Sequence, residues 1–126
     1  MFNHISIGVR DVANAKRFYD AALKPLGYKC LSHGDESLGY GKDAVALWVL
    51  ASARPVKPDA KSGLHFCLDA PSRSSVDAFH AAALKAGGGD NGKPGLRPDY
   101  DKHYYAAFVT DPDGYRIEAY CGKAKG

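Results

Sequence analysis

The chain has 126 residues, enough for one domain with its own core, and it contains no apolar run approaching the roughly 20 residues that cross a membrane. Its net charge of +3 comes from scattered Lys and Arg residues, without the basic stripe or motif of a nucleic-acid-binding protein. No secretory signal is visible at the N-terminus, so we expect a cytoplasmic protein whose ligand is a small anionic or neutral molecule.

The three cysteines, Cys30, Cys67 and Cys121, are widely spaced and odd in number. This pattern argues against a disulfide framework and agrees with a reducing compartment. Because Cys67 and Cys121 lie in apolar, strand-like runs, we expect both to be small buried side chains.

The first half of the chain begins with a strand-like segment at residues 4–9, where β-branched residues alternate with other residues. A helical pattern follows at residues 13–23 and ends near Pro25 and Gly27. Three more strands are then expected, at residues 28–31, 36–40 and 44–50. A stretch rich in Pro, Lys and Ser follows at about 51–62, which indicates a linker.

The second half repeats this order at a constant offset of 61 positions, from residue 4 to residue 65. Residues 65–70 again resemble a strand, and residues 74–85 form a helical pattern that stops at a run of three glycines. Strands are expected within 90–98, at 104–110 and at 115–120, the last two joined by the turn Asp111-Pro112-Asp113-Gly114. Residues 90–102 also look irregular enough for a functional loop.

The repeat predicts an α+β fold built from two βαβββ modules within a single domain. The first module covers about residues 1–52 and the second about residues 63–122. Strand alternation places apolar residues toward the helices and leaves four unusual residues on the opposite face: His4, Trp48, His65 and Glu118. If both halves curve into one mixed sheet with the helices outside, these residues line a cup. Charged groups there require partners or a ligand.

The sequence resembles the vicinal oxygen chelate superfamily, which includes glyoxalase I, bleomycin resistance proteins and extradiol dioxygenases. The resemblance rests on a histidine opening each half, on the run from Val12 through Phe18-Tyr19 to Leu26-Gly27, and above all on the ending Phe108-Val109-Thr110-Asp111-Pro112-Asp113-Gly114-Tyr115-Arg116-Ile117-Glu118. It implies the cup-shaped fold, and it also implies a site inside the cup.

The resemblance further implies a divalent metal ion, such as Fe, Zn, Ni or Mn, held by His4, His65 and Glu118. Two histidines and one carboxylate form a facial triad that leaves open positions for substrate. The fourth ligand position of glyoxalase I corresponds to Trp48, which cannot bind a metal, and this argues against lactoylglutathione lyase activity. No glycine-rich nucleotide motif is present, so no nucleotide cofactor is expected. Related proteins often dimerise, and the modules of a homodimer could pair within or between chains.

Several residues are candidates for substrate contacts: Trp48, Arg97, Tyr104, Tyr105 and Tyr120. Arg97 could hold a carboxylate or phosphate by two hydrogen bonds, and Trp48 is either a cavity wall or part of the core. Glu118 is the candidate catalytic residue, as a general base. Two functions remain open. One is a metal-dependent lyase, isomerase or dioxygenase acting on a small oxygen-rich substrate, and the other is a metal-free protein that sequesters a toxic or antibiotic molecule.

Overall fold

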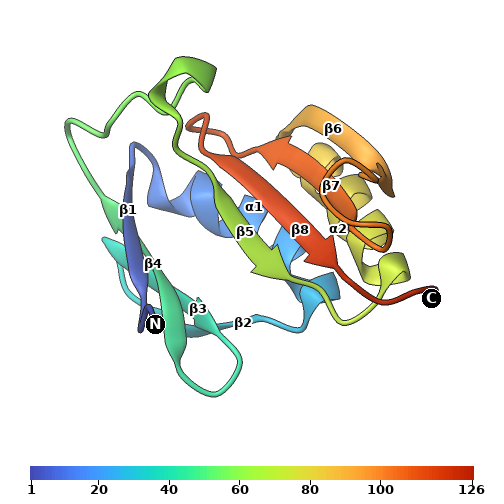
Figure 1. The fold of residues 1–126 in the computed structure, drawn as a ribbon. Helices are drawn as coiled ribbons and strands as arrows, with labels where there is room; N and C mark the ends of the chain where they lie inside the picture. Colours follow the sequence, from blue (N-terminus) through green and yellow to red (C-terminus); the bar gives the residue numbers. More distant parts are fainter.

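A computed structural model describes residues 1–126. Two modules with the same order of elements follow one another along the chain (Figure 1). The first consists of β1 (Ile5–Val9), α1 (Val12–Leu23), the 3-10 turn η1 (Lys24–Leu26), β2 (Lys29–His33), β3 (Ser37–Gly41) and β4 (Val45–Ala51). After the 3-10 turn η2 (Ala60–Ser62), the second consists of β5 (Phe66–Asp69), α2 (Arg73–Lys85), β6 (Gly89–Leu96), β7 (Tyr105–Thr110) and β8 (Arg116–Cys121).

Each module forms its own four-stranded mixed sheet. The strand orders are β1-β4-β3-β2 and β5-β8-β7-β6, and in both sheets the first strand runs parallel to the last while the remaining pairs are antiparallel. The two βαβββ modules and the α+β class predicted from the repeat are therefore confirmed. No helix is long and apolar enough to cross a membrane.

Both helices begin at a side chain that caps the backbone. Asp11 accepts a hydrogen bond from the Asn14 amide at the start of α1, and Ser72 accepts one from the Ser75 amide at the start of α2. After η1 the chain turns at Gly27, whose φ of 87° lies in the left-handed region that glycine adopts readily. The local signals in the sequence thus place the helices at nearly their predicted residues.

The second module differs from expectation in one segment. A strand was expected somewhere within residues 90–98, and β6 extends over Gly89–Leu96, so the irregular stretch expected at residues 90–102 is reduced to the loop at residues 97–104 before β7. β6 lies at the edge of its sheet, so no further strand needs a backbone N–H from Pro94 on the outer side. The register of β6 with β7 shifts around Gly92. Edge position and bulges therefore allow a strand in a sequence rich in Gly and Pro.

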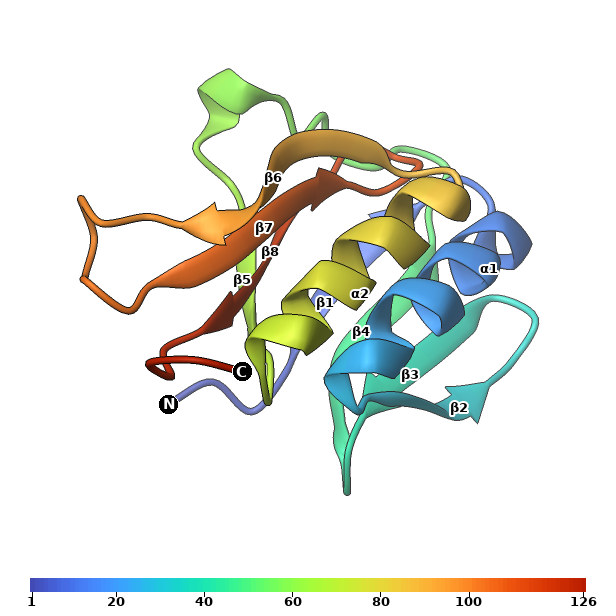
Figure 2. The same ribbon diagram turned by 90° about the vertical axis from the view of Figure 1, so that its right-hand side faces the viewer.

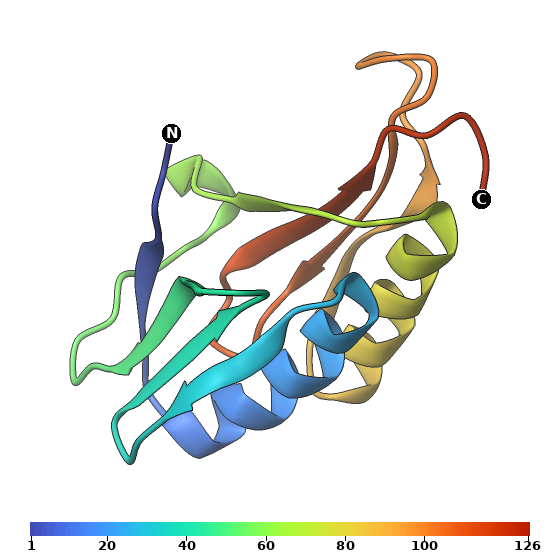
Figure 3. The same cartoon turned by 90° about the horizontal axis from the view of Figure 1, so that it is seen from below.

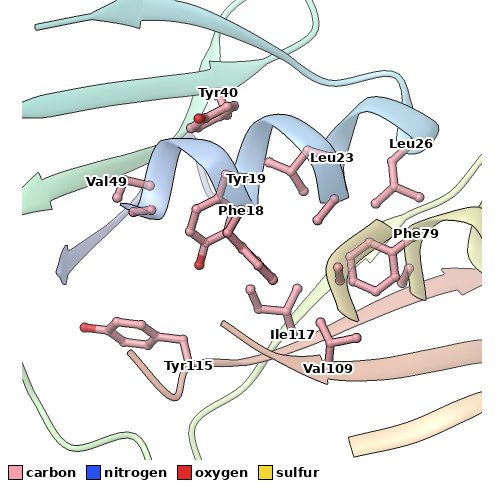
Figure 4. Close-up of a cluster of buried hydrophobic side chains, with 14 of the residues drawn as sticks. Phe18, Tyr19, Leu23, Leu26, Tyr40, Val49, Phe79, Val109, Tyr115 and Ile117 are labelled. Atoms are coloured by element: carbon pink, nitrogen blue, oxygen red, sulfur yellow. The ribbon is translucent and has the colours of Figure 1, made fainter. Parts of the chain in front are cut away.

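The two modules share one hydrophobic core. α1 packs against α2, and the helix-facing residues of both sheets join one cluster of 20 buried side chains. Figure 4 shows Phe18 and Tyr19 of α1 extending toward Ile117 of β8, with Phe79 of α2 nearby. The helices lie side by side (Figure 2), in the angle between the two sheets (Figure 3). The opposite face of each sheet, which we call its open face, is therefore turned outward.

The turn between β7 and β8 ties the modules together through hydrogen bonds. The Tyr19 hydroxyl donates to Asp111 Oδ2 at 2.6 Å, and Asp111 Oδ1 accepts from the amides of Asp113 at 2.9 Å and Tyr115 at 2.8 Å. The Tyr115 hydroxyl donates to the Gly8 carbonyl at 2.8 Å. Burial raises the pKa of Asp111 above its ordinary value, although these hydrogen bonds oppose the shift.

Replacing Tyr19 with Phe should lower the free energy of unfolding by about 1–3 kcal/mol, because it leaves a buried Asp111 oxygen without its partner. Urea denaturation measures the change. Tyr100→Phe is the matched control, since that exposed hydroxyl has no hydrogen bond to the protein, and it should change the value by less than about 0.5 kcal/mol. Equal effects of the two substitutions would contradict the proposed importance of this link.

Candidate active site in the second module

The site is centred on Glu118, in the middle of β8. Along this strand Arg116, Glu118 and Tyr120 alternate with residues that face the helices. β8 lies between β5 and β7, so that Glu118 has Cys67 on one side and Phe108 on the other as register partners. Its side chain is only 4% exposed, an unusual environment for a carboxylate.

Two side chains hold the Glu118 carboxylate, one on each oxygen. His65 Nε2 lies 3.1 Å from Oε1, and the Tyr104 hydroxyl donates to Oε2 at 2.5 Å. Burial raises the pKa of Tyr104, and its hydrogen bond to Glu118 raises it further, so at neutral pH this hydroxyl carries its proton. His65 is the more accessible partner, with 45% of its side chain exposed.

Cys67 also lies on the open face beside Glu118. The expectation that it is buried was wrong, because strand alternation directs it away from the helices; Cys121, by contrast, is buried. Partial desolvation of the thiol by its neighbours, followed by the negative charge of Glu118, raises the pKa of Cys67 to about 12. The thiol therefore stays protonated at neutral pH and is a poor nucleophile.

A pocket of about 350 Å³ opens beside Glu118. It is lined by seven residues of the second module: His65, Asn91, Tyr100, Tyr104, Phe108, Arg116 and Glu118. Its aromatic wall is ordered by contacts between rings, since Tyr104 lies edge-on to Tyr100 at 5.1 Å and packs against Tyr120 at 4.3 Å between centroids. The pocket thus combines a held carboxylate, an imidazole, a cation and an aromatic surface.

Within one chain, the three expected metal ligands do not all meet. His65 and Glu118 are adjacent, but His4 lies in the first module, is exposed and has Nδ1 2.7 Å from Asn3 Oδ1. No group of three or more His, Cys, Asp or Glu side chains is close enough to hold an ion. Trp48 lies half-buried on the open face of the first sheet, where its ring covers Gly39; a Cβ atom there would approach Trp48 Cζ3 to 2.9 Å.

The remaining candidate residues divide between the two faces of the second sheet. Tyr104 lines the pocket and Tyr120 packs behind it, whereas Tyr105 donates to Asp77 of α2 on the helix side. Arg97, at the start of the loop, turns back to β6 and donates to the carbonyls of Gly95 at 2.9 Å and Lys93 at 2.7 Å. The residues that we had not put forward are Asn91, Tyr100, Phe108 and Arg116. Of these, Arg116 was detectable from its spacing of two residues from Glu118 on one strand.

Comparisons with known proteins agree with this architecture. The sequence profile of the Glyoxalase/Bleomycin resistance protein/Dioxygenase superfamily matches residues 1–119. The chain is 30% identical over 129 residues to the uncharacterized protein YqjT of Bacillus subtilis, with 92% of this chain and 94% of the relative covered.

Among solved structures, a glyoxalase/bleomycin resistance protein from Albidiferax ferrireducens superposes with a TM-score of 0.85 at 32% identity, covering 95% of this chain and 98% of that one. The fosfomycin resistance protein FosX from Mesorhizobium loti shares the fold, with a TM-score of 0.72 at 12% identity, covering 98% and 93%. With a profile matched over nearly its whole length, this chain belongs to the Glyoxalase/Bleomycin resistance protein/Dioxygenase superfamily.

Proposed function

We propose that the protein is a metal-dependent enzyme of the lyase, isomerase or dioxygenase type, acting on a small oxygen-rich substrate in the pocket beside Glu118. The observation that carries this proposal is the 3.1 Å separation of His65 Nε2 and Glu118 Oε1. Two neighbouring ligand atoms, each bound to one divalent ion at about 2.0–2.2 Å, lie about 3 Å apart. The donor set therefore fits two adjacent positions on one ion.

The third ligand in this proposal is His4 of a second copy of the chain. Each chain uses the helix-facing sides of both sheets for its own core, so the open faces remain available for a partner. They carry exposed apolar residues as well as the exposed His4, including Leu31 at 43% and Leu50 at 37% exposure. In a two-fold homodimer, the first sheet of each copy would lie over the second sheet of the other. Such a dimer encloses two equivalent pockets, one in each chain.

A bound divalent ion would supply Lewis acidity toward two vicinal oxygens of the substrate. Glu118 is the candidate proton acceptor, because it is a buried carboxylate at the base of the pocket. Tyr104 orients this carboxylate through Oε2, as outer-shell partners of ligating groups do. Tyr100 and Tyr104 form an aromatic wall on one side of the site.

One observation favours a second candidate function, metal-free sequestration of a small molecule. Every buried side-chain nitrogen and oxygen already has a hydrogen-bond partner, and the Glu118 oxygens are both engaged by protein groups. The carboxylate is thus accommodated without a cation. The superfamily includes bleomycin resistance proteins, which agrees with a binding role of this kind.

Metal binding distinguishes the two functions. After reconstitution with iron, zinc, nickel or manganese, elemental analysis should find about one ion per chain, and His65→Ala should lose it because one ligand is removed. His33→Ala is the control, since that exposed histidine at the end of β2 has no side-chain hydrogen bond, and it should retain the metal. If the wild-type protein takes up none of the four metals, the metal-dependent function is wrong and metal-free sequestration is the function that remains.

A mixture of two variants that each lack one metal ligand tests whether the metal site is shared between two copies of the chain. His4→Ala and His65→Ala should each bind no metal alone. A heterodimer of the two contains one complete site, because one copy supplies His4 and the other His65 and Glu118. Random exchange after mild unfolding and refolding should therefore restore about one quarter of the wild-type metal content. No recovery in mixed dimers, confirmed by mass spectrometry, would place all ligands within one chain.

A further inference from the structure

We propose that Arg116 is the anion-binding residue of the pocket, and that the ligand is a planar ring with a carboxylate at one end and its reacting oxygens at the other. The inference deepens the proposed function by naming the substrate class. It rests on that function for the identification of the pocket beside Glu118 as the ligand site.

Arg116 is a cation without a partner in the protein. Its guanidinium forms no hydrogen bond or ion pair, although the side chain is half-buried and lines the pocket. It also lines an adjoining hollow of about 610 Å³ whose wall carries two other cations, Arg10 and Lys57, together with two carboxylates, Asp59 and Asp113. A half-buried guanidinium with free donors is suited to bind a carboxylate through two hydrogen bonds.

The two other arginines nearby are already engaged. The guanidinium of Arg97 donates to two backbone carbonyls and lies over the Phe108 ring, 5.3 Å from its centroid. Arg10 pairs with Asp113 at 3.7 Å. Arg116 is therefore the cation of the pocket wall whose donors remain free for a ligand.

The spacing along β8 favours a compact ligand. Arg116 and Glu118 are two residues apart on one strand and share a face, which separates their attachment points by about 7 Å. They form no ion pair with each other, because the Glu118 oxygens are held by His65 and Tyr104, and the Arg116 guanidinium stays available to a ligand. Attachment points this close are compatible with a spacer of about one six-membered ring between a carboxylate held at Arg116 and reacting oxygens at Glu118.

The surface between the two ends favours a flat spacer. Tyr100 and Tyr104 form an edge-to-face pair that lines the same pocket, and Phe108 contributes a third ring. Aromatic walls of this kind bind planar apolar groups by stacking or edge contacts. The pocket thus offers a cation at Arg116, aromatic rings in its wall and an acid–base group at Glu118. A ligand that matches all three is an aromatic carboxylate.

The test uses 4-fluorobenzoate as the probe and neutral 4-fluorobenzamide as its matched control, with binding followed by fluorine NMR. The full chain is titrated as purified and again after dialysis against EDTA. In both states the wild-type protein should prefer the benzoate. Arg116→Gln should weaken benzoate binding about tenfold, the loss expected for a hydrogen-bonded charge, and leave benzamide binding unchanged.

Two further variants make the result interpretable. Arg54→Gln removes an arginine that has no side-chain partner and lies outside the pocket, and it should bind benzoate as the wild type does. Arg116→Lys keeps the charge but not the two-point geometry, and it should show an intermediate loss, even if the glutamine variant were to fold poorly.

The proposal is overturned if wild-type protein binds benzoate no more tightly than benzamide, if it binds neither, or if folded Arg116→Gln or Arg116→Lys binds benzoate as tightly as the wild type. Because the titration includes metal-free protein, failure of metal binding would leave this readout intact. Conversely, loss of the Arg116 effect would leave the metal content of the protein unchanged.

Discussion

The packing of α1 against α2 determines which faces of the two sheets are buried and which are exposed. Because the helix-facing residues of both sheets are buried in one core, the two modules are held in a single relative orientation. Burial of this many apolar side chains is the main source of stability in a domain of this size. The consequence is that both open faces point outward, and the chain cannot close its own two sheets around one cavity.

The geometry of Glu118 follows from this arrangement. A carboxylate on the central strand of an open sheet has neighbours on both sides, and here those neighbours supply a hydrogen bond to each oxygen. Removal from water disfavours a charged carboxylate, and the two hydrogen bonds offset that cost. The same contacts fix its position, which a proton acceptor or a metal ligand requires. A held carboxylate therefore suits both proposed functions, and metal content is the property that separates them.

Much of the fold could be predicted from residues alone. The constant offset between the halves, the Asp11 and Ser72 caps and the Asp111–Gly114 turn are local features, and local hydrogen bonds largely decide where helices and turns begin. A strand within residues 90–98 was expected, but the bounds and register of β6 were harder to predict, because its pairing with β7 depends on an edge position and on bulges that a Gly- and Pro-rich sequence does not reveal. The open-face side chains of β8 were predictable because strand alternation has a fixed period of two.

The sequence by itself determined the two modules, the family and the candidate residues, since each follows from a short-range pattern or from a motif contained within one segment. Only the tertiary structure decided which of those residues meet. His4 lies apart from His65 and Glu118 because the relation between modules depends on helix packing across the whole chain. Arg97 donates to the carbonyls of Lys93 and Gly95 in the preceding strand β6, and Arg116 remains unpaired beside the pocket. The partners of a long, flexible side chain are set by the backbone that folds around it, and residue type alone does not specify them.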